Sequence, residues 1–427
     1  MINCFIPFLS LPQARQTVRA LGLCDRIKNI YLLATEKIPD EVEGCEMLMI
    51  DSPASTATFR TIALHADTAY TLLYTKYTAF EPGQFAFERL LAIAGDTNAG
   101  MLYADRYLLK NGNSQQAPVI DYQKGSLRDD FDFGSLLFFR SSVLKQAVRA
   151  MDADYRFAGL YDLRLRVSEL AELVHVNEYL YSEVETDIRK SGEKLFDYVD
   201  PKNRAVQIEM EAVCTAYLKR VGGYLAPDFE PVTFDAGGFE QEASVIIPVR
   251  NRIRTIEDAI CSVLAQKTTF RFNLIIVDNH STDGTSEAIG KYTADGRVVH
   301  LVPERSDLGI GGCWNVGVHH PACGKFAVQL DSDDVYSGPD TLQKIVDAFY
   351  EQNCAMVVGT YRMTDFKMNE IPPGIIDHRE WTLENGRNNA LRINGLGAPR
   401  AFYTPVLRRI NLPNTSYGED YALGLRI

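Results

Sequence analysis

The chain has 427 residues, with 44 basic and 56 acidic side chains and a formal net charge of -12. Such an excess of negative charge argues against a surface that binds nucleic acid or an anionic membrane over its whole extent. The length exceeds that of an ordinary single domain, so we expect two domains.

The eight cysteines are scattered, without a CxxC pair or the spacing of a zinc site. We therefore expect them to be reduced, which favours a cytoplasmic protein. No signal-peptide pattern opens the chain, and nowhere do eighteen apolar residues follow one another. The sequence thus predicts no transmembrane segment, and it leaves peripheral association with the inner face of a membrane open.

Strand-like and helix-like stretches alternate along the chain, most clearly in the second half. This alternation predicts an α/β fold with mainly parallel sheets flanked by helices, whose ligands lie outside the carboxyl ends of the strands. In the second half the predicted strands are 244–249, 273–277, 298–302 and 326–330, and the predicted helices are 255–266, the segment after Thr285 and 309–318.

The first half repeats features of the second half in the same order. The matched pairs are 3–8 with the strand containing Pro248, 29–33 with 273–277, 70–83 with 326–339, and 101–107 with 356–363. This ordered repeat predicts two copies of one α/β domain, 1–240 and 241–427, with a joint near 222–238. The alternative is that any two α/β segments can be aligned in this way.

The segment F-A-V-Q-L-D-S-D-D at 326–334 is an apolar strand that ends on three carboxylates. Isolated buried carboxylates are costly, so several acids at one strand end indicate a site for a cation or for hydroxyl and phosphate groups. In the first half, T-K-Y-T at 75–78 stands where the second half has 331–334, and Ala34 stands where the second half has Asp278. Because these residues do not build a cation site, we expect the first domain to be non-catalytic.

Five motifs of the second half together resemble the family 2 glycosyltransferases. The motifs are A-S-V-I-I-P-V-R-N at 243–251, I-I-V-D-N-H-S-T-D-G-T at 275–285, G-I-G-G-C-W-N-V-G at 309–317, Q-L-D-S-D-D at 329–334 and G-E-D at 418–420. The resemblance implies a GT-A fold and a nucleotide-sugar donor. It covers the second half well and the first half only through the repeat.

The resemblance also implies roles for single residues. Asp333 would ligate Mg2+ or Mn2+ at the donor diphosphate, and Asp331 would bind the ribose or support the metal shell. Asp278 would accept a hydrogen bond from the nucleotide base. Asp420 would be the catalytic base, which takes the proton of the acceptor hydroxyl on the face opposite the leaving group. The further donor-binding residues are Pro248, Arg250, Asn251 and Asn315.

Three glycines at 309, 311 and 312 are expected to let the backbone approach the donor. The segment N-G-L-G-A-P-R-A-F-Y at 394–403 resembles the flexible acceptor loop of the family, whose glycines permit closure. For His378 and Trp381, packing is favoured over contact with a sugar.

The ends of the two halves differ. In the first half, Asp162 lies near the counterpart of Asp420 after a one-residue adjustment, and a predicted strand follows at 174–181. The second half stops at Ile427. We therefore expect a shortened gene product, with further residues in the native chain.

The sequence thus predicts an inverting, metal-dependent glycosyltransferase. It would move a sugar from a nucleotide-sugar donor, with UDP favoured by the family, to a hydroxyl of a glycan or lipid-linked saccharide acceptor in cell-surface polysaccharide synthesis. One alternative is a sugar nucleotidyltransferase, although R-N-R-I-R-T at 250–255 lacks the glycines that its loop requires. Another is a non-catalytic sugar-binding or scaffolding protein.

Overall fold

A computed structural model describes residues 1–427 except 38–40, 111, 185–202, 235–236 and 394. The chain forms two compact units, Met1–Tyr224 and Leu225–Ile427, which we call the first and second unit. The division falls within the joint expected near 222–238 and before the expected boundary at 240/241, because the segment after Tyr224 packs on the second unit. Val232 N donates to Asn353 O at 2.9 Å, and the ring of Phe234 lies edge-on to that of Phe326 at 5.3 Å.

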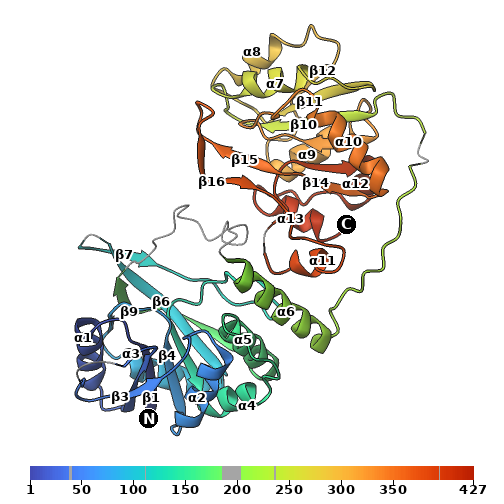
Figure 1. The fold of residues 1–427 in the computed structure, drawn as a ribbon. Helices are drawn as coiled ribbons and strands as arrows, with labels where there is room; N and C mark the ends of the chain where they lie inside the picture. Colours follow the sequence, from blue (N-terminus) through green and yellow to red (C-terminus); the bar gives the residue numbers. More distant parts are fainter. Residues whose placement is uncertain (38–40, 111, 185–202, 235–236, 394) are drawn as a thin grey trace. The chain divides into compact units, whose positions relative to one another are not determined.

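The first unit is a mixed sheet with helices on both faces (Figure 1). The strand order is β3-β2-β1-β4-β8-β6-β9-β5, with β7 paired to β6. Helices α1 and α3 cover one face, and α2, α4 and α5 cover the other. The elements are β1 (Ile2–Pro7), α1 (Leu11–Gly22), β2 (Ile27–Ala34), β3 (Glu46–Met49), α2 (Thr56–His65), β4 (Tyr70–Tyr74), β5 (Phe80–Pro82), α3 (Ala86–Thr97), β6 (Met101–Lys110), β7 (Asn113–Ala117), β8 (Leu136–Arg140), α4 (Ser141–Arg149), α5 (Gly159–Leu170), β9 (Leu173–Val184) and α6 (Arg204–Val221).

The second unit has a sheet of order β12-β11-β10-β13-β17-β14 and a separate hairpin of β15 and β16. Strands β10 and β11 are buried at nearly every position, as expected of parallel strands that helices cover on both faces. The elements are β10 (Ala243–Val249), α7 (Ile256–Leu264), β11 (Phe272–Asp278), α8 (Thr285–Gly290), β12 (Val298–Leu301), α9 (Ile310–His319), β13 (Phe326–Gln329), α10 (Thr341–Gln352), β14 (Met356–Val358), β15 (Tyr361–Thr364), β16 (Glu370–Ile376), α11 (Gly386–Asn389), β17 (Arg400–Tyr403), α12 (Thr404–Ile410) and α13 (Glu419–Gly424). The predicted α/β class, with mainly parallel sheets flanked by helices, is confirmed.

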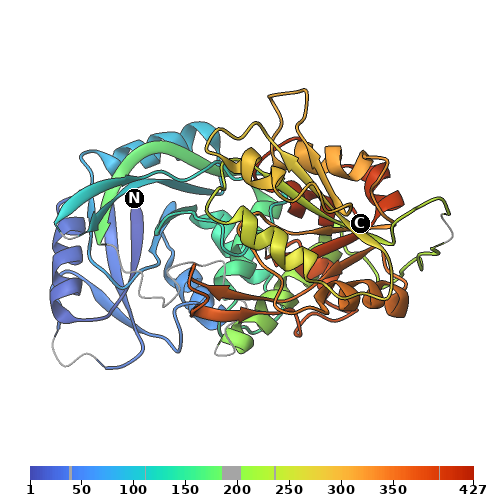
Figure 2. The same cartoon turned by 90° about the horizontal axis from the view of Figure 1, so that it is seen from above.

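Six strands have the same order in the two sheets, β3-β2-β1-β4-β8-β6 and β12-β11-β10-β13-β17-β14. We call this common arrangement the shared frame. In each, the first strand pairs in parallel with the second and fourth, and an antiparallel strand follows the fourth. Single backbone bonds also repeat: Ser141 N donates to Ala69 O at 3.0 Å, and Thr404 N donates to Lys325 O at 3.0 Å. These bonds set Ser141 and Thr404 at equivalent positions. The first unit differs in its long strands β6 and β9, which run side by side (Figure 2).

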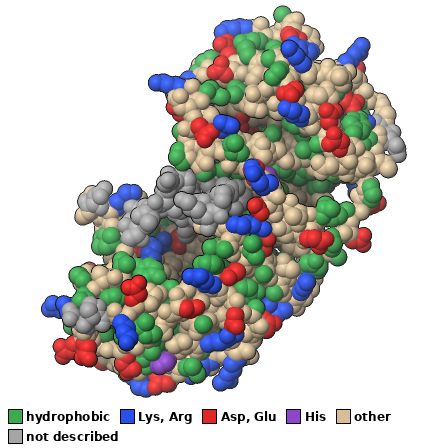
Figure 3. Space-filling view, in the orientation of Figure 1, with side chains coloured by type: hydrophobic (Ala, Val, Ile, Leu, Met, Phe, Trp, Pro, Cys, Tyr) green, Lys and Arg blue, Asp and Glu red, His purple; other side chains and the backbone are tan. Residues whose placement is uncertain are grey.

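Among the described residues, no helix has the length and apolar character that crossing a membrane requires. On the face drawn in Figure 3, basic and acidic side chains are interspersed rather than segregated by sign. The surface in that view therefore offers no broad field of one charge.

Candidate active site

Acidic side chains gather where β11 and β13 end. Both strands are parallel neighbours of β10, so their carboxyl ends meet at the same edge of the sheet. Asp278 is the last residue of β11, and Asp331 follows β13 by two positions. The structure thus brings these two predicted residues to one edge, as the strand pattern required.

Asp278 is fully buried. One carboxylate oxygen accepts a hydrogen bond from Ser281 N at 3.0 Å, the other accepts one from the Ser286 hydroxyl, and His300 Nε2 lies 3.6 Å from the second oxygen. Burial alone would raise the pKa of Asp278, but the hydrogen bonds from Ser281 and Ser286 outweigh it and the pKa is lowered. Asp278 therefore holds the turn after β11 as a carboxylate, and contact with a nucleotide base stays a prediction.

The strand end after β13 carries more negative charge than its surroundings neutralise. Burial raises the pKa of Asp331, the carboxylates of Asp333 and Asp420 add to the effect, and Gln329 and Arg400 oppose it. Restricted solvation and the carboxylates of Asp331 and Asp333 raise the pKa of Asp334 to about 6, although its side chain keeps contact with solvent. A divalent cation at this edge would relieve the repulsion.

The donor set at this edge fits a hard divalent cation, because all of its candidate ligands are carboxylate oxygens. Asp333 is exposed, with Arg252 Nε 3.6 Å from one of its oxygens. Within the part of the chain that the structure describes, these aspartates do not bring three ligand atoms within 4.8 Å of one another. The arrangement therefore suits Mg2+ or Mn2+ held by one or two protein carboxylates, with phosphate oxygens and water completing the shell.

Asp420 lies in the first turn of α13 and is linked to the same edge. Its Oδ2 forms an ion pair with Arg400 Nη1 at 2.5 Å. Arg400 Nε donates to Gln329 Oε1 at 2.6 Å, and Gln329 Nε2 donates to Asp331 Oδ1 at 2.9 Å. Sequence reasoning missed both linking residues, although Gln329 opens the Q-L-D-S-D-D motif and Arg400 lies in the predicted acceptor loop.

The glycines at the start of α9 were expected to admit a donor, and the structure corrects this. A Cβ at Gly309 would lie 2.6 Å from Thr415 C, one at Gly311 would lie 2.0 Å from Pro413 O, and one at Gly312 would lie 2.3 Å from a side-chain oxygen of Asn414. The close approach is therefore to the segment before α13. These glycines seat the loop that leads into Asp420.

Asn315 was predicted to contact the donor, but its amide is engaged elsewhere. Its Nδ2 donates to Leu412 O at 2.8 Å, and its Oδ1 accepts from Leu412 N at 3.0 Å. Asn315 thus fastens the same loop, and its contact with the donor stays a prediction.

Three predicted donor-binding residues lie at the end of β10. Pro248 pairs with Val277 across the sheet, and Arg250 is exposed beyond it. Asn251 has a φ of 55° and accepts a hydrogen bond from Thr282 N at 2.8 Å. Asn251 therefore joins the loops after β10 and β11. Arg250 and Asn251 are both exposed, and their contact with a donor stays a prediction.

The predicted acceptor loop packs on aromatic side chains. A Cβ at Gly395 would lie 2.6 Å from Trp381 Cζ2, and the rings of His378 and Trp381 lie 5.2 Å apart. The first residue of that loop, Asn394, lies outside the described residues. These contacts agree with the expected packing role of Trp381 and His378.

The shared frame identifies what the first unit has in place of the acids. With Pro7 matched to Pro248, the strand registers place Ala34 at the position of Asp278, Thr75 at that of Asp331 and Tyr77 at that of Asp333. None of the three is an acid. The sequence alignment of this edge therefore agrees with the registers of the two sheets.

The counterpart of Asp420 was placed near Asp162, and this was wrong. The loop before α5 meets α2 through Thr56 N and Tyr155 O at 2.8 Å, just as the loop before α13 meets α9 through Gly311 N and Thr415 O at 3.0 Å. The helix starts that follow also match, with the bond from Asp162 N to Ala158 O repeated by Ala422 N and Gly418 O, both at 2.9 Å. Leu160 therefore occupies the position of Asp420.

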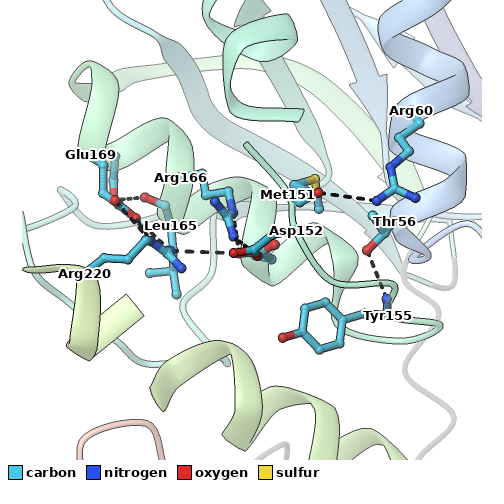
Figure 4. Close-up of polar contacts among 11 residues, drawn as sticks. Thr56, Arg60, Met151, Asp152, Tyr155, Leu165, Arg166, Glu169 and Arg220 are labelled. Atoms are coloured by element: carbon cyan, nitrogen blue, oxygen red, sulfur yellow. Dashed lines mark hydrogen bonds and ion pairs between the residues drawn. The ribbon is translucent and has the colours of Figure 1, made fainter. Parts of the chain in front are cut away.

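Asp162 has a structural partner instead. Its Oδ1 accepts from Arg166 Nε at 2.9 Å, and Arg166 also pairs with Asp152 at 2.6 Å. Figure 4 shows Arg166 beside Asp152, close to the contact between Thr56 and Tyr155. This ion pair stabilises the start of α5. The first unit thus has no acid at the position that Asp420 occupies in the second unit, because Leu160 stands there.

The fold and the strand-end site first define a class for the second unit. It is an α/β protein with carboxylates at the carboxyl ends of parallel strands, the edge at which such folds bind their ligands. Residues 244–409 match the family model described as glycosyl transferase family 2. The match covers less than half of the chain, and it confirms the resemblance of this segment to the family.

Curated relatives share the match over part of their length. The chain is 33% identical over 120 residues to "Putative teichuronic acid biosynthesis glycosyltransferase TuaG" of Bacillus subtilis, which covers 28% of this chain and 46% of that protein. It is 38% identical over 97 residues to "Uncharacterized glycosyltransferase RC0461" of Rickettsia conorii, covering 23% of this chain and 15% of that protein. The chain thus spans less than half the length of these relatives.

A solved structure also matches part of the chain. The crystal structure of S. aureus TarS 1-349 covers 43% of this chain and 53% of its own, with 25% identity and a TM-score of 0.35. The TM-score is too low for this likeness to carry an argument, and the resemblance to the family rests on the sequence match over residues 244–409.

Proposed function

We propose that the second unit is an inverting, metal-dependent glycosyltransferase that moves a sugar from a nucleotide-sugar donor to a hydroxyl of a glycan or lipid-linked acceptor. The observation that carries the proposal is the meeting of Asp331, Asp333 and Asp420 at one sheet edge. Asp331 and Asp333 lie within the segment 244–409 that matches glycosyl transferase family 2, and Asp420 lies beyond its end. A UDP-sugar is the proposed donor. The B. subtilis relative is named for teichuronic acid biosynthesis, which supports a role in surface polysaccharide synthesis. We also propose that the protein acts in the cytoplasm, at the inner face of the membrane.

The residues divide the reaction between two sides of the sugar. Asp333 and Asp331 would hold Mg2+ or Mn2+, which supplies positive charge against the diphosphate when bound. Asp420 takes the proton of the acceptor hydroxyl as its oxygen forms the new bond to the anomeric carbon. The bond from that carbon to the phosphate oxygen breaks, the nucleoside diphosphate leaves with the electron pair, and the anomeric configuration inverts.

Two variants of the full chain test these roles. Asp333→Ala is expected to abolish metal-stimulated release of UDP from UDP-sugars, because the phosphate-side carboxylate is lost. Asp420→Asn should lower transfer about 100-fold or more and leave donor binding in place, since it removes only the proton acceptor. Asp347→Asn is the matched control, because Asp347 is an exposed aspartate on α10 that pairs with Gln343 at 2.8 Å. Wild-type rates in both site variants would count against the enzyme assignment and favour a binding or scaffolding protein.

We also propose that the first unit is non-catalytic. Its frame has Ala34, Thr75, Tyr77 and Leu160 at the four acidic positions of the second unit. If this is correct, Asp333→Ala in the full chain leaves no metal-dependent turnover. Residual turnover that responds to Mn2+ and persists when Asp331→Ala is added would assign activity to the first unit.

A further inference from the structure

Two buried side chains connect the acidic strand end to the candidate base. Contacts of 2.9, 2.6 and 2.5 Å run from Asp331 through Gln329 and Arg400 to Asp420. Gln329 is 4% exposed and Arg400 is 6% exposed. Asp331 and Asp420, which we place on opposite sides of the reacting sugar, are therefore joined by direct polar contacts through two buried side chains.

The path uses the geometry of an arginine side chain. Arg400 donates to Gln329 through Nε, whereas Nη1 contacts both Asp420 and Leu396 O, the latter at 2.6 Å. A guanidinium holds these donors in one rigid plane, which a lysine ammonium cannot do. A buried guanidinium is costly unless its N–H groups donate hydrogen bonds and its charge is paired. Arg400 is therefore held in place by its contacts with Gln329, Leu396 and Asp420.

The first unit shows that the fold does not need this path. Its frame has Leu73 at the position of Gln329 and Leu137 at that of Arg400, and these leucines face each other across β4 and β8. Both are buried in one hydrophobic cluster, and Leu160, at the position of Asp420, packs against the same cluster. The first unit therefore lacks both the polar path and the acids that the path connects in the second unit.

We infer that Gln329 and Arg400 are positioning residues that set Asp420 relative to Asp331. They hold the base where it meets the acceptor hydroxyl while the donor lies at the strand end. The inference rests on the proposed function. Its physical basis is that a displacement of about 1 Å in a reacting group costs about 100-fold in rate.

The test replaces Gln329 and Arg400 by leucine, the residue that the first unit has at both positions. Gln329→Leu with Arg400→Leu, in the full chain, is expected to fold, because leucines pair in the same frame at Leu73 and Leu137. Binding of UDP with Mn2+, measured by calorimetry, and the KM for the donor should change by less than about threefold, while kcat for transfer falls about 100-fold.

Arg400→Lys keeps the positive charge but lacks the planar set of N–H donors that the guanidinium provides. We expect kcat to fall about tenfold at nearly unchanged donor affinity. The control is Arg297→Leu, which removes a partly exposed pair with Asp295 of 2.8 Å outside the site and should leave transfer unchanged.

The outcomes separate this inference from the proposed function. A wild-type kcat in the leucine pair and in Arg400→Lys overturns the inference, and so does a loss of donor binding equal to the loss of kcat. If the leucine pair does not fold, the ratio of kcat to donor affinity in Arg400→Lys decides by the same criteria. If Asp333→Ala and Asp420→Asn also keep wild-type rates, the proposed function itself fails.

Discussion

The contact between Gly311 and the loop before α13 allows a sharp test of how the base is seated. Gly311 is buried in the first turn of α9, and a Cβ there would lie 2.0 Å from Pro413 O and 3.1 Å from Glu419 Cβ. Pro413 O is a backbone atom and Glu419 Cβ is attached directly to the backbone, so neither is the far end of a flexible side chain that could move away. The substitution Gly311→Ala must therefore push the loop, and with it Asp420, away from α9.

The size of the effect follows from the distances. The Pro413 carbonyl would have to retreat by more than about 1 Å to reach van der Waals separation from the new methyl group. Forced overpacking of this kind costs about 1–3 kcal/mol, and the helix preference of alanine over glycine offsets about 0.5–1 kcal/mol. We expect a net loss of about 1–2 kcal/mol in the free energy of unfolding and a fall in transfer of about 100-fold from the displaced base.

Urea unfolding and initial rates of transfer measure the two effects. Gly290→Ala is the matched control, because Gly290 also lies in a helix and a Cβ there would meet nothing within 4 Å. That variant should keep its rate and gain up to about 1 kcal/mol. A Gly311→Ala protein with wild-type stability and transfer would refute the idea that this glycine seats the loop.

Three further predictions concern charge. Asp278→Asn should lower the free energy of unfolding by about 1–3 kcal/mol at pH 7. The pKa of Asp278 is lowered from 3.8 in the folded state, so its carboxylate stabilises the fold above that pH. The difference in unfolding free energy from wild type should therefore shrink as the pH falls below about 4. Asp334→Asn should raise the unfolding temperature at pH 7.5 and not at pH 4. The pKa of Asp334 is raised from 3.8 to about 6, so ionisation lowers the stability of the wild type progressively between these pH values, and the full loss remains above pH 6. An equal shift at both pH values would contradict the repulsion at this edge. UDP with Mn2+ at a hundredfold excess over Kd should stabilise the wild type by about 2.7 kcal/mol and stabilise Asp333→Ala far less, as scanning calorimetry will show.

The sequence alone determined the class of fold and the acidic edge. Alternating patterns specify strands and helices locally, and parallel strands with polar ends must bring those ends to one side of a sheet. The strand pattern by itself was therefore enough to place Asp278 and Asp331 together. The lost acids at Ala34, Thr75 and Tyr77 followed from the same strand periodicity, because a strand register carries its side chains with it.

Only the tertiary structure decided what surrounds the base. The partners of Asp420, the contact of Gly311 with Pro413, and the use of Asn315 on Leu412 join segments about a hundred residues apart or less, whose meeting depends on how α9, β17 and α13 pack. Loop segments have no periodicity that fixes their side chains, which is why Asp162 was matched to Asp420 in place of Leu160. Local sequence specifies which elements form, whereas the spacing between them is set by close packing of side chains from distant parts of the chain.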